Sequence, residues 1–400
     1  MPGGVPNPFG NFGNIDWNEV MQMLQSPGPV NMKVARATAE TVAISDLETG
    51  EQRPEPPIPP DATKSFDDVV RATQLTVADA TSLSGALSVP FRAVDRRGWA
   101  ATTVDSLEPV FASLAQALSR GQLGGAPDAA MGFSPEAFLP MIMQQLVPLL
   151  LGTWAGSMIG SLAHQSLGQY DLPLPLAGEP ALLFVVRNVD DFANEWSLPG
   201  DELRYSLALR EVVHGAERSV PWVRDRLVRL ASAYVGGYEV QTSALEEQLG
   251  NFDMSDPSSM AGIEQLSDPD RLLGAMQSEH QQPILEELQR FVSVLEGYTD
   301  TVVSRLGHGM AASHDRIDEA LRRHRLERGE AGAFVDRLLG LQLDRDHYEA
   351  GVAFCRGVVE RSDDTLDQLN RLWSDESMVP TPAELQAPGL WLARIDLPTE

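Results

Sequence analysis

Cysteine and lysine are almost absent from this sequence of 400 residues. Its one cysteine, Cys355, excludes an internal disulfide and a four-cysteine zinc site, and its apolar helical surroundings predict a buried, unreactive thiol. Lys33 and Lys64 are the only lysines, so arginine carries nearly all of the positive charge. With 30 basic against 57 acidic residues, the net charge of −27 disfavours nucleic acid and anionic membranes as partners.

Several common signatures are also missing. The sequence has no G-x-x-x-x-G-K phosphate loop, no dinucleotide fingerprint after a strand and no G-x-S-x-G elbow, so it signals neither nucleotide binding nor a serine nucleophile. No charged segment followed by an apolar one opens the chain, so we expect no secretory signal. With a single cysteine, this pattern favours a cytoplasmic location.

The residues that are present predict one large helical domain after a disordered start. Residues 1–29 are rich in Gly, Pro and Asn, which is typical of disorder, and residues 30–400 form the predicted domain. Within it we expect a proline-rich linker at 46–63 and a mobile acidic loop at about 251–270. Apolar periodicity predicts helices at 30–44, 65–79 and 104–120.

An uncharged segment from Leu139 to Leu162 carries Gly152, Gly156 and Gly160 at G-x-x-x-G spacing. Such a segment forms either a membrane span or a tightly packed helix pair. Internal prolines and the lack of flanking basic residues favour a buried helix that another helix approaches closely, so we expect no membrane span. Further along, the apolar segment Pro180–Val186 predicts a buried strand.

The most informative motif is Arg210-Glu211-Val212-Val213-His214, which lies in a predicted core helix that begins near Asp201. In the intact pattern, H-E-x-x-H, two histidines four residues apart share one helix face and bind one metal ion. The glutamate after the first histidine acts as general base on a water molecule, which is the role that Glu211 would take. Here arginine stands in the place of the first histidine.

Two carboxylates further along the chain complete the pattern. Glu296 and Asp300 are four residues apart, so they share one face of a predicted helix. Glu296 would supply the third metal ligand. Asp300 would lie behind it and orient a histidine ligand by accepting a hydrogen bond.

Beyond these motifs, the chain resembles the zincin-like metallopeptidases of the type 2 group over most of residues 28–396. The resemblance is carried by Leu167–Pro175, Pro180–Val186, the motif at 210–214, the segment around Glu296, and Leu338–Leu341 with Tyr348 and Gly351. It implies a mainly α zincin-like fold (α+β minor), with an active-site helix, a small strand element and a long buried central helix. It also implies zinc held at position 210, His214 and Glu296, with Glu211 catalytic.

Arg210 departs from this pattern. A guanidinium group has only donors and stays protonated, so it has no lone pair for zinc. Two protein ligands remain where zinc sites normally use at least three, and we expect zinc to be absent or weakly bound. Carboxylates that share a cleft need a cation, because they otherwise raise one another's pKa. We therefore predict a salt bridge from Arg210 to Glu296 or Asp300.

The other histidines do not replace the missing ligand. Neither His164 nor His308 has ligand spacing to His214. His324 lies in an arginine-rich stretch, residues 315–328, that predicts an exposed charged helix.

Three functions stay open at this stage. The first is a catalytically impaired zincin relative that serves as a binding or regulatory module for a protein or peptide. The second is an active zinc-dependent hydrolase that uses His214, Glu296 and a non-standard third ligand. The third is a structural assembly protein, which a homo-oligomer built on the glycine-rich helix would suit.

Overall fold

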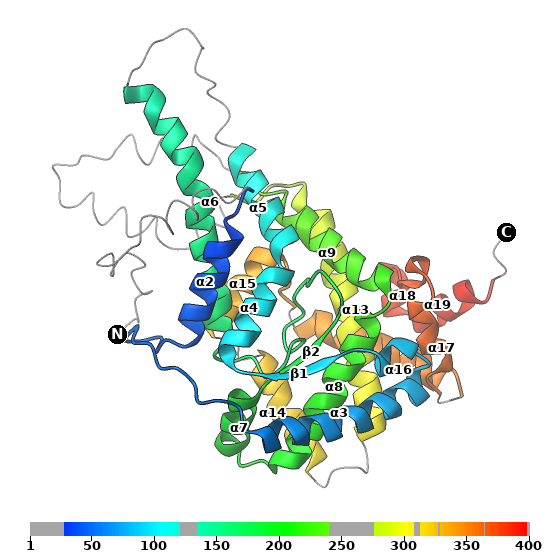
Figure 1. The fold of residues 1–400 in the computed structure, drawn as a ribbon. Helices are drawn as coiled ribbons and strands as arrows, with labels where there is room; N and C mark the ends of the chain where they lie inside the picture. Colours follow the sequence, from blue (N-terminus) through cyan, green and yellow to red (C-terminus); the bar gives the residue numbers. More distant parts are fainter. Residues whose placement is uncertain are drawn as a thin grey trace.

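The computed structural model describes residues 28–120, 135–239, 276–307, 313–326, 329–343, 345–363 and 365–397, with the backbone alone at 135–147, 326 and 330. The predicted acidic loop at 251–270, and all but the last two residues of the predicted disordered segment 1–29, lie outside the described residues. Figure 1 shows a mainly helical molecule with a short two-stranded sheet near its centre, as the sequence predicts.

The elements follow one another along the chain as a long series of helices (Figure 1). The first part contains α2 (Met32–Ala43), α3 (Pro60–Thr81), η1 (Ser84–Leu87), β1 (Phe91–Val94), α4 (Arg96–Ser106), α5 (Glu108–Arg120) and α6 (Pro135–Leu162). The middle part contains β2 (Leu182–Val185), α7 (Val186–Glu195), α8 (Gly200–Arg218), α9 (Pro221–Val235) and α13 (Gln281–Gly307). The last part contains α14 (His314–Leu326), α15 (Glu330–Leu339), α16 (Arg345–Glu360), α17 (Asp367–Asn370), η2 (Arg371–Trp373), η3 (Glu376–Met378), α18 (Pro382–Gln386) and α19 (Pro388–Ile395).

Helix α8 lies in the interior of the molecule, between α3 and α13 and against α9, α14 and β2. Leu203 and Leu207 begin its apolar face, and every residue from 206 to 218 is buried. A helix that is buried on all sides must find internal partners for each of its polar side chains. The charged residues of the motif are therefore held in fixed contacts rather than by solvent.

The predicted strand at 180–186 is confirmed as β2, but the sequence analysis missed its partner β1. The two strands are parallel, with Phe91 opposite Leu182 and Val94 opposite Val185. On its other side, β2 holds the loop that follows α6, through a bridge between Gly168 and Phe184. This pairing holds the Leu-Gly-Gln-Tyr-Asp segment, residues 167–171, in contact with α8.

The glycine face of α6 packs against α2 within the same chain. A Cβ atom built on Gly152, Gly156 or Gly160 would come within 2.2–2.8 Å of main-chain carbonyl oxygens of α2 and its N-cap. Glycine is needed here because the two backbones touch. The predicted helix pair is thus confirmed, and the idea that this face drives assembly between chains is wrong because α2 already covers it. Of the helices that the structure describes, none is long and apolar enough to cross a bilayer.

Replacing Gly156 with alanine is expected to lower the free energy of unfolding by about 1–3 kcal/mol, because the added methyl group overpacks a tight contact. The built Cβ lies 2.2 Å from the carbonyl oxygen of Ala35. This oxygen belongs to the backbone, so it can move only if helix α2 shifts with it. Urea denaturation measures the change. Gly200→Ala is the matched control, since its Cβ meets nothing closer than a flexible arginine at 3.7 Å. Equal stability of the two variants would contradict close packing of α2 on α6.

Two predicted boundaries were wrong, and proline explains both. Helix α3 begins at Pro60, inside the predicted linker 46–63, because proline suits the first position of a helix. The predicted helix 104–120 is divided at Leu107 into α4 and α5. Pro109 lies just after the division, and a proline there cannot continue the hydrogen bonding of α4.

Candidate functional site

Helices α8 and α13 bring the motif and the downstream carboxylates together around Arg210. The Arg210 side chain is buried, and its Nη2 donates to Glu296 Oε2 at 2.5 Å. Its Nη1 donates to Asp300 Oδ1. Glu296 and Asp300 lie on the same face of α13, as their spacing predicts, so one planar guanidinium reaches both. The predicted salt bridge is confirmed, and it includes both acids rather than one.

Tyr348 and Arg325 extend this charged cluster from two further helices. The Tyr348 hydroxyl, on α16, donates to Glu296 Oε2 at 2.7 Å. Arg325, on α14, has its Nη2 3.7 Å from Asp300 Oδ1. Arg325 is buried, so the prediction that its stretch forms an exposed helix was wrong at this residue. Two cations and two carboxylates thus balance one another in this cluster.

Burial disfavours charge on Arg210 and on Glu296, but the ion pairs between them and their neighbours outweigh it. Burial lowers the pKa of Arg210, yet Asp300 and Glu296 raise it well above its usual range. Burial raises the pKa of Glu296, yet Arg210 and Arg325 bring it below its usual value. Arg210 and Glu296 are therefore both charged at neutral pH.

His214 is fully buried, one turn along α8 from Arg210. Three groups surround its Nδ1, each at 3.1 Å: Glu217 Oε2, Arg218 Nη1 and Thr299 Oγ1. Its Nε2 has no hydrogen-bond partner among the described residues and lies 3.7 Å from Glu296 Oε1. Burial, then Arg218 and Arg210, lower the His214 pKa well below its usual value. The imidazole is therefore neutral.

The three residues that hold His214 were not predicted from the sequence. Glu217 and Arg218 follow it by three and four residues, so they share its face of α8, and that spacing was a usable signal. Thr299 comes from α13, and nothing in the sequence relates it to His214. Asp300, which we expected to orient a histidine, instead contacts Arg210.

Glu211 is buried and accepts hydrogen bonds from a loop. The backbone N–H groups of Gln169 and Tyr170 donate to its carboxylate at 3.0 Å. A Cβ atom on Gly168 would lie 2.4 Å from Glu211 Cδ, so the loop can wrap the carboxylate only with glycine there. The structure thus explains why glycine is needed in the Leu-Gly-Gln-Tyr-Asp segment: the segment surrounds the Glu211 carboxylate. Its aspartate, Asp171, pairs at 3.1 Å with His324 Nε2.

The pKa of Glu211 gives a test of this environment. Burial and then Asp171 raise the pKa from 4.5 to about 8, against the lowering effect of the N–H groups of Tyr170 and Gln169. A pKa raised on folding stabilises the protein fully below pH 4.5, and this contribution is lost as pH rises through about 8.

Relative to Glu211→Gln, the unsubstituted protein is therefore expected to lose roughly a few kcal/mol of unfolding free energy as pH rises across this window. Urea denaturation of both proteins between pH 5 and pH 9 measures the difference. The comparison cancels the other titrating groups that both proteins share. Parallel stability curves would show that folding leaves the Glu211 pKa unshifted.

Comparisons with known proteins give a family for this chain and a solved structure with a similar fold. The family model for zincin-like metallopeptidases matches residues 30–392. The chain belongs to the zincin-like metallopeptidase family. Its fold is also similar to a crystal structure from Chloroflexus aurantiacus described as a "putative hydrolase with a novel fold", with a TM-score of 0.58 and 22% identity over 92% of this chain and 100% of that one. No curated protein matches the sequence.

Zinc is the metal that the zincin-like family implies, and the side chains of this chain do not fit it. At position 210, where an H-E-x-x-H pattern has its first histidine, this chain has a guanidinium, which has no lone pair. Glu296 Oε2 already accepts from Arg210 and Tyr348. His214 Nε2 and Glu296 Oε1 are the donor atoms left, whereas a protein zinc site normally has at least three ligands. Within the described part of the chain, no group of three His, Cys, Asp or Glu side chains could hold a metal ion.

Proposed function

We propose that this protein is a zincin-like family member that has exchanged its zinc for an internal cation and serves as a binding or regulatory module for a protein or peptide. The observation that carries the proposal is the Arg210 guanidinium between Glu296 and Asp300. It supplies positive charge where a zincin holds its metal, and it cannot activate water as a Lewis acid does.

The position of Glu211 also supports loss of hydrolysis. A general base needs hydrogen-bond reach to the water that it activates. Both oxygens of Glu211 accept instead from the backbone of Gln169 and Tyr170, and its side chain is buried. With a pKa near 8, it is largely protonated at neutral pH and a poor proton acceptor.

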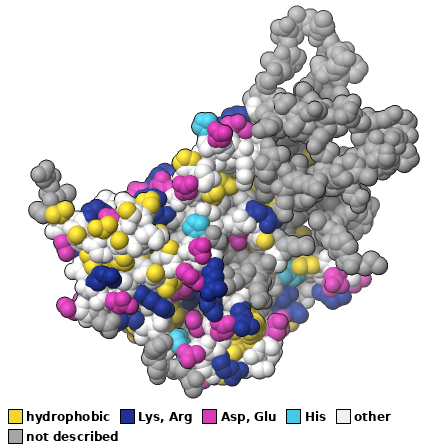
Figure 2. Space-filling view, turned by 180° about the vertical axis from the view of Figure 1, so that it is seen from behind, with side chains coloured by type: hydrophobic (Ala, Val, Ile, Leu, Met, Phe, Trp, Pro, Cys, Tyr) yellow, Lys and Arg dark blue, Asp and Glu magenta, His cyan; other side chains and the backbone are white. Residues whose placement is uncertain are grey.

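The partner that we favour is a protein or peptide in the cytoplasm rather than nucleic acid. A phosphate backbone requires a broad cationic surface. Figure 2 shows acidic and basic side chains intermixed on the face that it presents, with hydrophobic side chains between them. The net charge of −27 adds to this preference.

The retained hydrolase is the second candidate, because His214 Nε2 lacks a hydrogen-bond partner among the described residues and faces Glu296. Metal content separates the two. Purified protein dialysed against buffer is expected to keep far less than about one zinc per chain, because about three protein ligands are needed for tight binding. Mass spectrometry of the metal measures it. A full equivalent of zinc that survives dialysis would overturn the proposal.

A further inference from the structure

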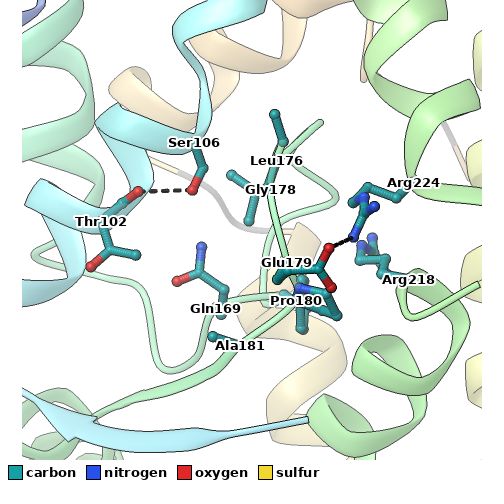
Figure 3. A pocket seen from close by; sticks show the side chains of 12 residues that line it. Thr102, Ser106, Gln169, Leu176, Gly178, Glu179, Pro180, Ala181, Arg218 and Arg224 are labelled. Carbon is teal, nitrogen blue, oxygen red and sulfur yellow. Dashed lines mark hydrogen bonds and ion pairs between the residues drawn. The ribbon is translucent and has the colours of Figure 1, made fainter. Parts of the chain in front are cut away.

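A second pair of arginines, Arg218 at the end of α8 and Arg224 in α9, lines a small pocket (Figure 3). The pocket is lined by Thr102, Ser106, Gln169, Tyr170, Leu176, Ala177, Gly178, Glu179, Pro180, Ala181, Arg218 and Arg224. Among these lining residues, Arg218 and Arg224 are the cations and Glu179 is the single acid. The lining is therefore positively charged, although the whole chain is strongly acidic.

Arg218, which lines the pocket, is buried, and two of its three guanidinium nitrogens have no hydrogen-bond partner among the described residues. Its guanidinium stacks over the Tyr170 ring, with Cζ 4.7 Å from the ring centroid. Its Nη1 faces His214, while Nε and Nη2 have no hydrogen-bond partner among the described residues. Leaving two nitrogens of a buried guanidinium without acceptors is costly, so this side chain favours an incoming anion.

Glu217, the acid beside Arg218, reaches only one nitrogen of the guanidinium. Its Oε2 lies 3.6 Å from Arg218 Nη1, and it also contacts His214 Nδ1 at 3.1 Å. Among the described residues, this leaves Arg218 Nε and Nη2 without an acceptor.

Arg224, in the first turns of α9, stands at the entrance. Its Nη1 lies 3.5 Å from Glu179 Oε1 and its Nε 3.5 Å from Asp225 Oδ1. The Glu179 side chain is 91% exposed, so this pair is held weakly. Figure 3 shows the Glu179 carboxylate joined to Arg224 by a dashed line, with the Arg218 side chain next to Arg224 in this view. The carboxylate occupies the position that an external anion would take.

We infer that this pocket binds a small ligand or chain end carrying one anionic oxygen group, a carboxylate or a phosphate, which displaces Glu179 and pairs with Arg224 and Arg218. The inference goes beyond the proposed function, because it uses different side chains and holds whether or not zinc binds near Glu296. The narrow lining suits a single anionic group rather than an extended polyanion.

Calorimetric titration tests the inference at fixed ionic strength with three probes: inorganic phosphate, trialanine with a free carboxylate, and trialanine amide. Binding of the phosphate alone indicates a phosphate ligand, and binding of the free peptide but not its amide indicates a chain end. Either result supports the site. Equal binding of the peptide and its amide, or no binding of any probe at millimolar concentration, overturns it.

Three variants locate the binding. Arg224→Gln is expected to weaken it about tenfold or more, the usual effect of losing one charge-assisted hydrogen bond. Glu179→Gln is expected to tighten it several-fold, because it removes the internal competitor. Arg229→Gln is the control, since it removes the same charge from an exposed position on α9 and is expected to change nothing. An Arg224→Gln protein that binds as tightly as the control would overturn the inference, and the zinc measurements would still stand.

Discussion

Replacing Arg210 with histidine is expected to convert the protein into one that keeps about one zinc ion per chain through dialysis, because the change completes a three-ligand set. The new imidazole would share one face of α8 with His214, and Glu296 lies opposite on α13. His214 already has its Nδ1 held and its Nε2 facing Glu296. Metal mass spectrometry after dialysis measures the content, and added zinc is expected to raise the melting temperature.

Arg210→Gln is the matched control for this change. It removes the same cation but adds no imidazole. Any zinc that this variant binds therefore measures only the loss of charge repulsion between Arg210 and the zinc ion. A second control, Arg210→His combined with His214→Ala, returns the site to two ligands and is expected to lose the zinc again. If Arg210→His retains no more zinc than Arg210→Gln, the surrounding side chains no longer have the geometry of a zincin site.

Replacing Arg210 with methionine is expected to lower the free energy of unfolding by about 3–5 kcal/mol, the usual cost of removing one partner from a buried ion pair. Methionine fills much of the volume, but Glu296 and Asp300 lose the cation between them. The loss is expected to shrink at acidic pH, because protonated carboxyl groups no longer need a cation. Urea denaturation at neutral and acidic pH measures both effects.

Two further proteins separate charge from packing. Arg229→Met removes an exposed arginine paired with Glu376 and is expected to cost less than about 1 kcal/mol, as surface pairs do. The triple variant Arg210→Met, Glu296→Gln, Asp300→Asn removes all three charges and is expected to regain much of the lost stability. A loss below about 1 kcal/mol in Arg210→Met alone would mean that the buried carboxylates find another cation, such as Arg325.

Much of the fold could be predicted because its signals are local. Apolar periodicity gave α2 nearly to its ends and the start of α8, and the β-branched segment at 180–186 gave β2. The partner strand β1 was missed because four residues carry too weak a pattern. The division at Leu107 was not predicted because the apolar periodicity continues across it, although Pro109 is a sequence signal for a break.

Part of the candidate site could be predicted as well. Helical spacing placed Glu296 and Asp300 on one face, and the need for a counter-charge predicted their pairing with Arg210. The environment of Arg325 was misjudged, because an arginine-rich helix has the same composition whether one turn is exposed or buried. The partners of Glu211 were also not predictable, since backbone N–H groups carry no sequence signal.

What the sequence determined by itself is the chemistry of position 210. A guanidinium is protonated and lacks a lone pair in any fold, so it follows from one residue type that position 210 cannot bind zinc. Only the tertiary structure decided where that charge goes, which groups hold His214, and that Glu211 is enclosed by a loop. Apart from Glu217 and Arg218, which lie beside His214 on α8, these contacts join residues far apart in the chain. Their strength comes from burial, which the packing of α8 against its neighbours creates.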